Sequence, residues 1–292
     1  MTTASASPSP PYNVVITGGT KGIGKALAEE FIRIGDNVTI CSRDEQRVKS
    51  TVTELQQLRT LGGDNKACGV PVDVTKAADV SNFADYAVSE MGSVDLWINN
   101  AGTNAYTFKP LIEQSEEELS SVVQTNVLGI LLCCKEAIRV MRQQETAGHV
   151  FNMDGAGADG GATPRFAAYG ATKRSLEQLG KSLRAELQFA GITNVGIHNL
   201  SPGMVTTELL MAGADNKISK FFINCLAEEP KTVAEVLVPK IRAVPSSQAN
   251  NVLAKALGSG EYIRFLTKSR AYSQILRRLV AGERKNRFVQ ED

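Results

Sequence analysis

The sequence predicts a single α/β domain built on a doubly wound parallel sheet with helices on both faces. Two observations carry this prediction. Short β-branched runs alternate with helix-forming segments of roughly 12–18 residues, the pattern of parallel strands joined by crossover helices. The first of these runs also ends in glycines that lead directly into a helix. With 292 residues, 42% of them hydrophobic and 22% charged, the chain can bury the core that such a sheet requires.

The expected first strand, Asn13–Thr17, leads into the turn T-G-G-T-K-G-I-G and then into a helix. Such a turn places backbone N–H groups and the positive end of a helix dipole against a pyrophosphate, and glycine lets the backbone approach the ligand closely. A turn that is merely flexible is the alternative. We therefore predict a Rossmann-type dinucleotide site. Its expected contacts are Thr17, Gly18, Thr20, Lys21, Gly22, Ile23 and Gly24.

The second strand, Asn37–Cys41, is followed by Ser42 and Arg43, where a dinucleotide fold meets the adenosine ribose. An acidic residue there would favour a free 2′-hydroxyl, but Asp44 lies one position further on, in the expected cap of the next helix. The guanidinium of Arg43, assisted by Lys21, instead suits a 2′-phosphate. We expect NADPH rather than NADH, and ordinary surface charge is the alternative for both basic residues.

Two further strands complete the expected cofactor edge. The strand Ala67–Val72 ends at Asp73, which could accept from the adenine amino group or cap the helix that begins at Ala77. The strand Asp95–Ile98 runs into N-N-A-G, whose small residues again let the backbone approach a cofactor. The expected contacts at these two strand ends are Asp73, Val74, Asn100, Ala101 and Gly102.

A long helix over Glu116–Arg142 places Asn126 among apolar neighbours. A buried amide is costly unless it is hydrogen-bonded, so Asn126 has either a structural or a catalytic role. Strands at His149–Met153 and Asn194–Leu200 follow, and the second runs into S-P-G-M-V-T-T-E. This turn and its threonines suit a nicotinamide carboxamide and a phosphate. The expected contacts are Pro202, Gly203, Val205 and Thr206.

Tyr169 and Lys173 lie four residues apart in the segment Tyr169–Phe189, which predicts a helix. That spacing puts the phenol and the ammonium on one helix face. A lysine charge beside a tyrosine favours the tyrosinate, so the phenol can exchange a proton near neutral pH. Taken alone, such a pair is more often a coincidence on a helix surface.

Together these motifs resemble the short-chain dehydrogenase/reductase family. T-G-x-x-x-G-x-G, N-N-A-G, the helical Asn, Y-x-x-x-K and P-G follow one another in the order of that family from about Tyr12 to Glu208. The resemblance implies that Tyr169 exchanges the proton at the substrate oxygen. It also implies that Lys173 binds the nicotinamide ribose and lowers the pKa of the tyrosine, and that Asn126 helps to hold a proton-relay water.

One departure from the family matters. The family usually has a serine at the place of Ala156, and here the stretch up to Tyr169 contains none. The polar side chains nearby are Asp154, Asp159 and Thr163. A carboxyl group polarises a carbonyl only when protonated, so Asp154 would need a strongly raised pKa to replace the serine. Alternatively, Asp154 binds a hydrogen-bond donor on the substrate. The plainer interpretation is that it braces the glycine-rich loop that follows it, Gly155–Gly161.

Four longer segments narrow the resemblance: N-M-D-G-A-G, T-P-R-F-A-A-Y-G-A-T-K-R, H-N-L-S-P-G-M-V-T-T-E-L-L and K-F-F-I-N-C-L-A-E. They resemble the branch of the family that reduces chlorophyll b and lacks a membrane span. The resemblance implies reduction of the 7-formyl group of chlorophyll b or chlorophyllide b, in a chloroplast. A short-chain reductase of another carbonyl or alcohol, or a non-catalytic nucleotide-binding scaffold (both compatible with the cytoplasm), are the alternatives. The residues expected to contact the pigment are Met204, Leu209, Leu210 and Phe166.

We expect a disordered lead over 1–11, the dinucleotide-binding and catalytic domain over 12–245, and a C-terminal extension over 246–292. Glu261–Leu266 is the candidate last strand, and Ser269–Ala281 predicts a basic amphipathic helix. This helix either packs on its own domain or lies on an anionic surface such as the thylakoid membrane. Its apolar stripe consists of Tyr272, Ile275, Leu276 and Leu279.

The net charge of +1 gives no general attraction to nucleic acid, and we expect no bound metal. Five cysteines without a C-x-x-C pair predict reduced core thiols. The Ser/Pro-rich residues 1–11 suit a disordered lead or the remnant of a removed targeting segment. Because the long helices holding Asn126 and Tyr169 are where the family commonly assembles, we also expect a homo-oligomer.

Overall fold

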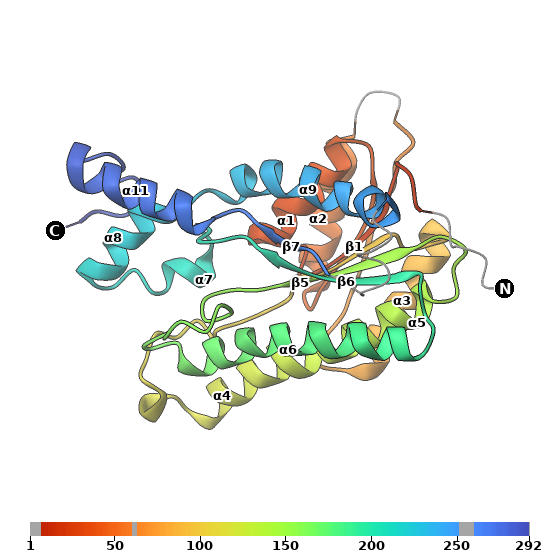
Figure 1. The fold of residues 1–292 in the computed structure, drawn as a ribbon, viewed down its shortest axis with the longest axis horizontal. Coiled ribbons are helices and arrows are strands. Elements are labelled where there is room, and N and C mark those ends of the chain that lie inside the picture. The colour runs from red at the N-terminus through yellow and green to blue at the C-terminus, as the bar shows by residue number, and fades with distance from the viewer. Residues whose placement is uncertain (1–6, 60–62, 251–259, 292) are drawn as a thin grey trace.

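The structure is a computed structural model that describes residues 7–59, 63–250 and 260–291 (Figure 1). Within these residues the chain forms one seven-stranded, wholly parallel sheet in the order β3-β2-β1-β4-β5-β6-β7. The strands are β1 (Asn13–Thr17), β2 (Asn37–Ser42), β3 (Ala67–Pro71), β4 (Leu96–Asn99), β5 (Gly148–Met153), β6 (Val195–Ser201) and β7 (Tyr262–Arg264).

Every strand that the sequence predicts is present within two residues of its expected limits. The β-branched runs form strands because they are buried on both faces, as parallel strands between two helical layers must be. The strand order reverses between β1 and β4. In a doubly wound sheet the ligand binds beyond the carboxyl ends of the strands at that reversal.

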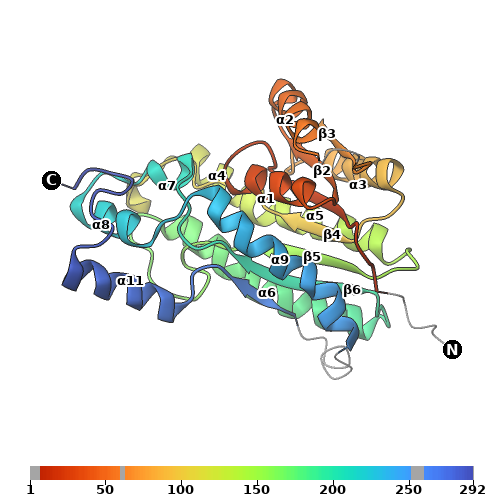
Figure 2. The same ribbon diagram turned by 90° about the horizontal axis from the view of Figure 1, so that it is seen from above.

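Helices cover both faces of the sheet, which confirms the predicted fold class (Figures 1 and 2). On one face Phe31 and Ile241 belong to a single core cluster, and on the other Phe83 packs edge-to-face on Trp97 with ring centroids 5.6 Å apart. All five cysteines are free thiols, and Cys68 is the one that is not fully buried. The first face carries α1 (Gly22–Arg33), α2 (Glu45–Gln57) and α9 (Pro230–Asn250), and the second carries α3 (Ala77–Met91), α5 (Gly129–Met141) and α6 (Ala167–Phe189).

The long helix predicted over Glu116–Arg142 has an interruption. α4 (Glu116–Val123) passes through a π-helical turn, Gln124–Leu128, before it continues as α5. Such turns often mark functional sites, and this one contains Asn126. The combined helix is long and apolar enough to cross a bilayer by composition, but 44% of its most apolar window is buried inside the protein. Its packing is that of a core helix.

The chain beyond residue 245 takes part in the main fold. α9 continues to Asn250, and β7 pairs with β6 at the edge of the sheet. Residues 1–6 of the predicted lead lie outside the described residues. The remaining helices, α7 (Glu208–Met211), α8 (Lys217–Leu226) and α11 (Lys268–Ala281), gather beyond the carboxyl ends of the strands (Figure 1). The amide of Asn224 on α8 holds the backbone of Phe288 and Val289, which fastens the C-terminal segment to α8.

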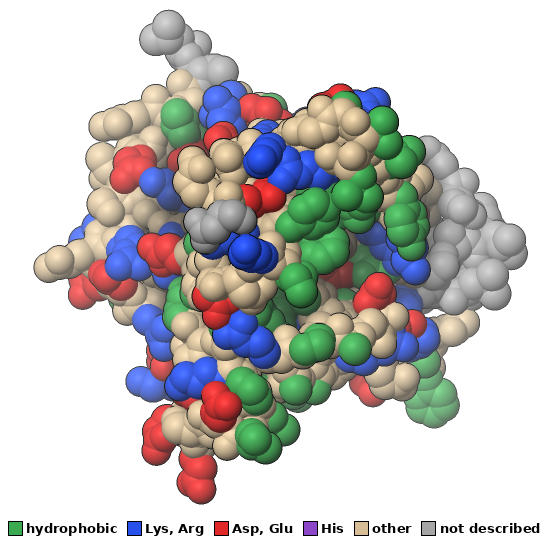
Figure 3. Space-filling model, turned by 90° about the vertical axis from the view of Figure 1, so that its left-hand side faces the viewer, with side chains coloured by type: hydrophobic (Ala, Val, Ile, Leu, Met, Phe, Trp, Pro, Cys, Tyr) green, Lys and Arg blue, Asp and Glu red, His purple; other side chains and the backbone are tan. Residues whose placement is uncertain are grey.

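The stripe of α11 faces outward. Tyr272, Leu276 and Leu279 are 71%, 62% and 68% exposed, whereas Arg278 is buried and pairs with Glu291. The helix does pack on its own domain, which is one of the two expectations, but through Arg278, which lies over the ring of Phe221 on α8, and not through the apolar stripe. The ion pair of Arg278 with Glu291 fixes this orientation. Figure 3 shows hydrophobic side chains gathered beside Lys and Arg on this end of the molecule.

Candidate active site

A cavity of about 1360 Å³ opens at the carboxyl edge of the sheet. It extends from Arg43 and Asp73, past the ends of β2 and β3, to Phe222 on α8 and Arg264 on β7. Between these ends it passes the glycine-rich turn and the pair Tyr169–Lys173. Most of the residues that the sequence assigns to a cofactor or a substrate thus share one continuous cavity.

The glycine-rich turn is packed tightly against the loop after β4. A Cβ on Gly24 would lie 2.3 Å from Nδ2 of Asn100, which donates to the carbonyls of Thr17 and Gly18 at 2.9 and 3.0 Å. The hydroxyl of Thr17 accepts from the N–H groups of Asn100 and Ala101 at 3.1 and 3.0 Å. Thr17, which we expected to contact the cofactor, is 1% exposed and lies behind the cavity wall, where it ties the two loops together.

At the adenosine end, Ser42, Arg43 and Asp73 line the cavity as predicted. Asp73 does not cap α3 directly; its carboxylate accepts from the N–H and hydroxyl of Thr75 at 3.0 and 2.8 Å. Burial opposes ionisation of Asp73, but these hydrogen bonds outweigh it and lower the pKa of the carboxyl. Lys21, expected to assist Arg43, forms an ion pair with Glu208 at 2.6 Å instead, because the segment after β6 approaches the turn.

Two independent features of the cavity suit a dinucleotide. The turn offers backbone where side chains cannot fit, with Gly18 and Gly22 at φ of +66° and +55°. The hydroxyl of Ser42 is buried and has no partner among the described residues, as expected of a group that binds a ribose hydroxyl or phosphate oxygen. The residues present therefore fit a nicotinamide dinucleotide.

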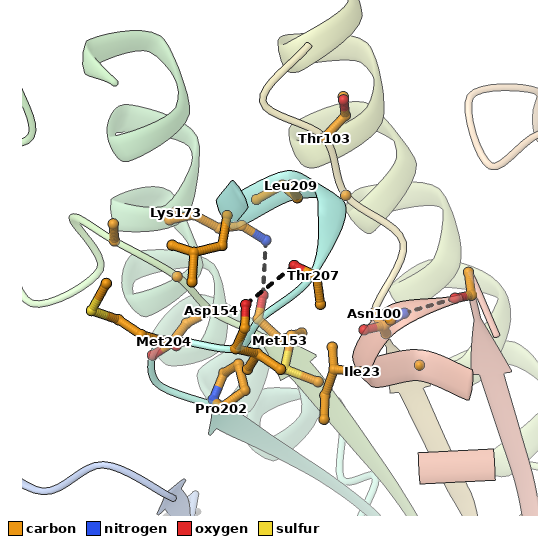
Figure 4. A pocket seen from close by; sticks show the side chains of 18 of the residues that line it. Ile23, Asn100, Thr103, Met153, Asp154, Lys173, Pro202, Met204, Thr207 and Leu209 are labelled. Carbon is orange, nitrogen blue, oxygen red and sulfur yellow. Dashed lines mark hydrogen bonds between the residues drawn. The ribbon is translucent and has the colours of Figure 1, made fainter. Parts of the chain in front are cut away.

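Tyr169 and Lys173 project from the first turns of α6 into the middle of the cavity. Lys173 is 4% exposed, and its ammonium donates to the carbonyl of Met153 at 3.0 Å (Figure 4). Burial lowers the pKa of Lys173 to about 8, against the opposing charge of Asp154. Burial and, secondarily, that same charge raise the pKa of Tyr169. The tyrosine is thus a protonated phenol beside a cation, the state that a proton donor needs.

Asn126 lies behind the cavity wall and is fully hydrogen-bonded. Its Oδ1 accepts from the N–H of Thr103 at 2.8 Å, and its Nδ2 donates to the carbonyl of Thr103 at 2.8 Å and the hydroxyl of Thr172 at 3.1 Å. These bonds explain how an amide 1% exposed is tolerated. They also fix the loop after β4 against α6, beside Lys173. The structural role of Asn126 is therefore visible, and its neighbour Thr125 is the one that lines the cavity.

Asp154, at the end of β5, is 6% exposed and lines the cavity near Lys173 (Figure 4). Its carboxylate accepts from the hydroxyl of Tyr262 on β7. Burial raises the pKa of Asp154, while hydrogen bonds from Tyr262 and Ser201 oppose the rise. Of the other polar candidates, Thr163 donates to the carbonyl of Phe166 outside the cavity lining. The carboxylate of Asp159 accepts from the N–H of Gly161 in its own loop.

The substrate end of the cavity is apolar. The four residues assigned to it by sequence all line it, namely Met204, Leu209, Leu210 and Phe166. Sequence reasoning missed Phe108, whose ring packs edge-to-face on Phe166 at a centroid distance of 3.9 Å, and it missed Tyr262. Neither lies in a motif, and Tyr262 reaches Asp154 across 108 residues of chain. The segment after β6 forms two short helices, α7 and α8, and Phe222 reaches the cavity from the second.

The family model described as short chain dehydrogenase matches residues 12–217. A relative from Oryza sativa subsp. japonica, "Chlorophyll(ide) b reductase NOL, chloroplastic", is 55% identical over 283 residues, covering 97% of this chain and 79% of the relative. The protein of the same name from Arabidopsis thaliana is 54% identical over 284 residues, covering 97% and 78%.

Among solved structures, the 3-ketoacyl-(acyl-carrier-protein) reductase from Brucella melitensis complexed with NADH is similar with a TM-score of 0.67 and 24% identity. The match covers 88% of this chain and 97% of that one. This likeness concerns the fold, and it agrees with the single parallel sheet described above.

Proposed function

Because the chain belongs to the short chain dehydrogenase family, we propose that it uses a nicotinamide cofactor to reduce the 7-formyl group of chlorophyll b or chlorophyllide b. The product is the 7-hydroxymethyl pigment. The observation that carries the proposal is the pair Tyr169–Lys173, which faces a large cavity walled by a glycine-rich loop and apolar side chains. A flat, apolar macrocycle suits such a wall, and likeness to the two reductases selects this aldehyde among other carbonyls.

A bound nicotinamide cofactor would supply the hydride for the formyl carbon. Tyr169 donates the proton to the carbonyl oxygen, and the ammonium of Lys173 stabilises the tyrosinate that remains. The hydrogen bond from Lys173 to the carbonyl of Met153 orients the ammonium toward that task. Asn126 holds Thr103 and Thr172 in place, and its proposed contribution to a proton-relay water is this positioning of the neighbouring loop.

The cofactor is proposed to be NADPH rather than NADH. Gly18, Gly22 and Ile23 would hold the pyrophosphate at the N-terminus of α1, and Ser42 with Arg43 would hold the 2′-phosphate. Since Lys21 pairs with Glu208, the discrimination is assigned to Arg43.

The protein is further proposed to act in the chloroplast, at the surface of an anionic membrane such as the thylakoid. The outward stripe Tyr272, Leu276 and Leu279 on α11 carries Arg277 beside it, and the helix begins next to Thr267, which lines the cavity. An apolar stripe flanked by basic residues suits the interface of an anionic bilayer. Flotation with anionic liposomes tests this: Leu276→Asp should abolish binding, and undiminished flotation would contradict it.

A homo-oligomer is proposed through the face of α4 and α5. Val123, Leu128 and Leu131 on this face are 50%, 38% and 44% exposed, and together they form an apolar surface that the domain itself does not cover. Light scattering coupled to gel filtration tests the proposal, and a monomeric mass at micromolar concentration would contradict it.

The deciding experiment combines purified protein, NADPH and chlorophyllide b, with the formyl absorption followed over time. Tyr169→Phe should abolish reduction and leave NADPH affinity unchanged, because the phenol donates a proton that phenylalanine lacks. Persistence of the formyl band with the wild-type protein, while NADPH binds, would reject the substrate. If the protein then reduced other carbonyls, it would be a short-chain reductase with a different substrate. If it reduced none of them, it would be a nucleotide-binding scaffold.

A further inference from the structure

Asp154 is the charged group that acts on both members of the proton-donor pair, Tyr169 and Lys173, among the described residues. It stands where β5 ends and the glycine-rich loop begins, 6% exposed. A buried carboxylate is costly unless it is hydrogen-bonded or paired. No salt bridge joins Asp154 to Lys173 in the described part of the chain, because the ammonium is turned to the carbonyl of Met153.

Two hydroxyl groups compensate for the water that Asp154 has lost. Tyr262 on β7 donates to its Oδ2, and Ser201 at the end of β6 donates to the same carboxylate. The ring of Tyr262 is held by the guanidinium of Arg264, which lies 3.8 Å from the ring centroid. The parallel pairing of β6 with β7 sets Ser201 opposite Arg264 and Asn199 opposite Tyr262, so the two hydroxyls come from adjacent strands.

From this geometry we infer that Tyr262 is a positioning residue. Its hydroxyl keeps Asp154 ionised, and the carboxylate of Asp154 keeps the ammonium of Lys173 charged beside Tyr169. The inference rests on the proposed proton-donor role of Tyr169 and Lys173. Where other members of the family have a serine that contacts the carbonyl, this chain has Asp154 and Tyr262, which instead set the charge of the proton-donor pair.

The expected pH dependence follows from the groups that face Asp154. These are Tyr262 and Arg264 on β7, Ser201 on β6, and Tyr169 and Lys173 on α6. Without the hydroxyl of Tyr262, the pKa of Asp154 rises further, so the carboxyl takes up a proton at higher pH. Where Asp154 is protonated, Lys173, whose pKa burial has lowered to about 8, loses its supporting charge. The acid limit of the active pH range should therefore move to higher pH, whereas the basic limit should stay, because Asp154 is ionised there in both proteins.

The variant Tyr262→Phe keeps the ring and removes the hydroxyl. In protein labelled with ¹³C at aspartate carboxyls, without cofactor or pigment, the Asp154 resonance should titrate about one unit higher or more, as expected for a lost hydrogen bond to a charged group. Ser201→Ala, which removes the second hydroxyl, should shift it in the same direction. Tyr86→Phe is the matched control, because it removes a phenol that hydrogen-bonds Cys68 outside the cavity lining, and it should shift nothing.

The pH profiles of NADPH affinity and of kcat/KM complete the test. In an Asp154→Asn background, adding Tyr262→Phe should change neither profile, since the carboxylate through which the phenol acts is gone. An unchanged Asp154 titration in Tyr262→Phe, or an added loss in the Asp154→Asn background, would overturn the inference. The NMR and NADPH readouts do not involve pigment, so they remain decisive if chlorophyllide b is not the substrate.

Discussion

Gly155 occupies the place where the structure leaves no room for any other residue beside Tyr169. A Cβ at this position would lie 2.2 Å from the hydroxyl oxygen of Tyr169 and 3.0 Å from Cζ. To reach the 3.4 Å of ordinary contact, the hydroxyl must retreat by about 1.2 Å. Because the hydroxyl is fixed to the ring, the side chain of Tyr169 must shift as a whole, and the proton-donating atom moves with it.

A displacement of about 1 Å at a reacting group costs roughly 100-fold in rate, or about 2.7 kcal/mol of activation free energy. We therefore expect Gly155→Ala to lower kcat for chlorophyllide b about 100-fold. Affinity for NADPH should remain close to wild type, because the glycine-rich turn and Arg43 are untouched. The rate at which the formyl absorption band disappears at saturating substrate measures kcat, and the fluorescence of bound NADPH measures affinity.

Gly161→Ala is the matched control in the same loop. Its nearest neighbour would be the exposed carboxylate of Asp159 at 3.2 Å, which can move aside, and Gly161 does not line the cavity. Its kcat should stay within about twofold of wild type. If Gly155→Ala retains wild-type kcat while melting normally, the position of the Tyr169 hydroxyl described here is not the one used in turnover.

Three further predictions concern the cofactor, the acid stability and the loop junction. Arg43→Ala should raise KM for NADPH by at least about tenfold and leave KM for NADH unchanged; equal effects on both would refute the assignment of the 2′-phosphate. Burial lowers the pKa of His149 to about 4 and that of His198 well below its ordinary value. Below about pH 6.5 the unfolded chain therefore binds protons that the folded chain does not bind, and folding stability falls. Urea unfolding should show about 3 kcal/mol lost from His149 alone between pH 7 and pH 4, and a flat stability over that range would contradict the burial of this pair. Thr17→Val should lower the unfolding free energy by about 2 kcal/mol because two loop N–H groups lose their acceptor, and a change below about 0.5 kcal/mol would show that they find another.

The cofactor half of the cavity could be predicted from sequence because each of its parts is local. A strand end, a glycine-rich turn and a helix N-terminus are consecutive in the chain, so Gly18, Gly22 and Arg43 fall into place once β1 and β2 are recognised. Thr17 and Asn126 show the limit of that reasoning. Both belong to the right motifs, but whether a side chain lines a cavity or braces its wall depends on hydrogen bonds to segments elsewhere, which spacing does not contain.

The substrate half was less predictable because it is assembled from distant segments. Phe108 meets Phe166 only after β4 and α6 have packed, and the sequence around Phe108 has no strand or helix periodicity to mark it. The same holds for α11, where composition predicts an amphipathic helix but not which side faces the protein. There the ion pair of Arg278 with Glu291 decides the orientation.

Tyr262, like Phe108 and α11, has a role that depends on distant parts of the chain. Its strand is only three residues long, and in isolation such a strand carries almost no sequence signal. Yet the register of that strand against β6 decides which side chain reaches Asp154: a slip of one residue would turn Tyr262 to the other face of the sheet and bring Ile263 to the carboxylate. An apolar neighbour would leave Asp154 with Ser201 alone, and the buried carboxyl would then be held neutral more easily. The charge state of the proton-donor pair at the centre of the cavity therefore depends on the pairing of the last strand at the edge of the sheet.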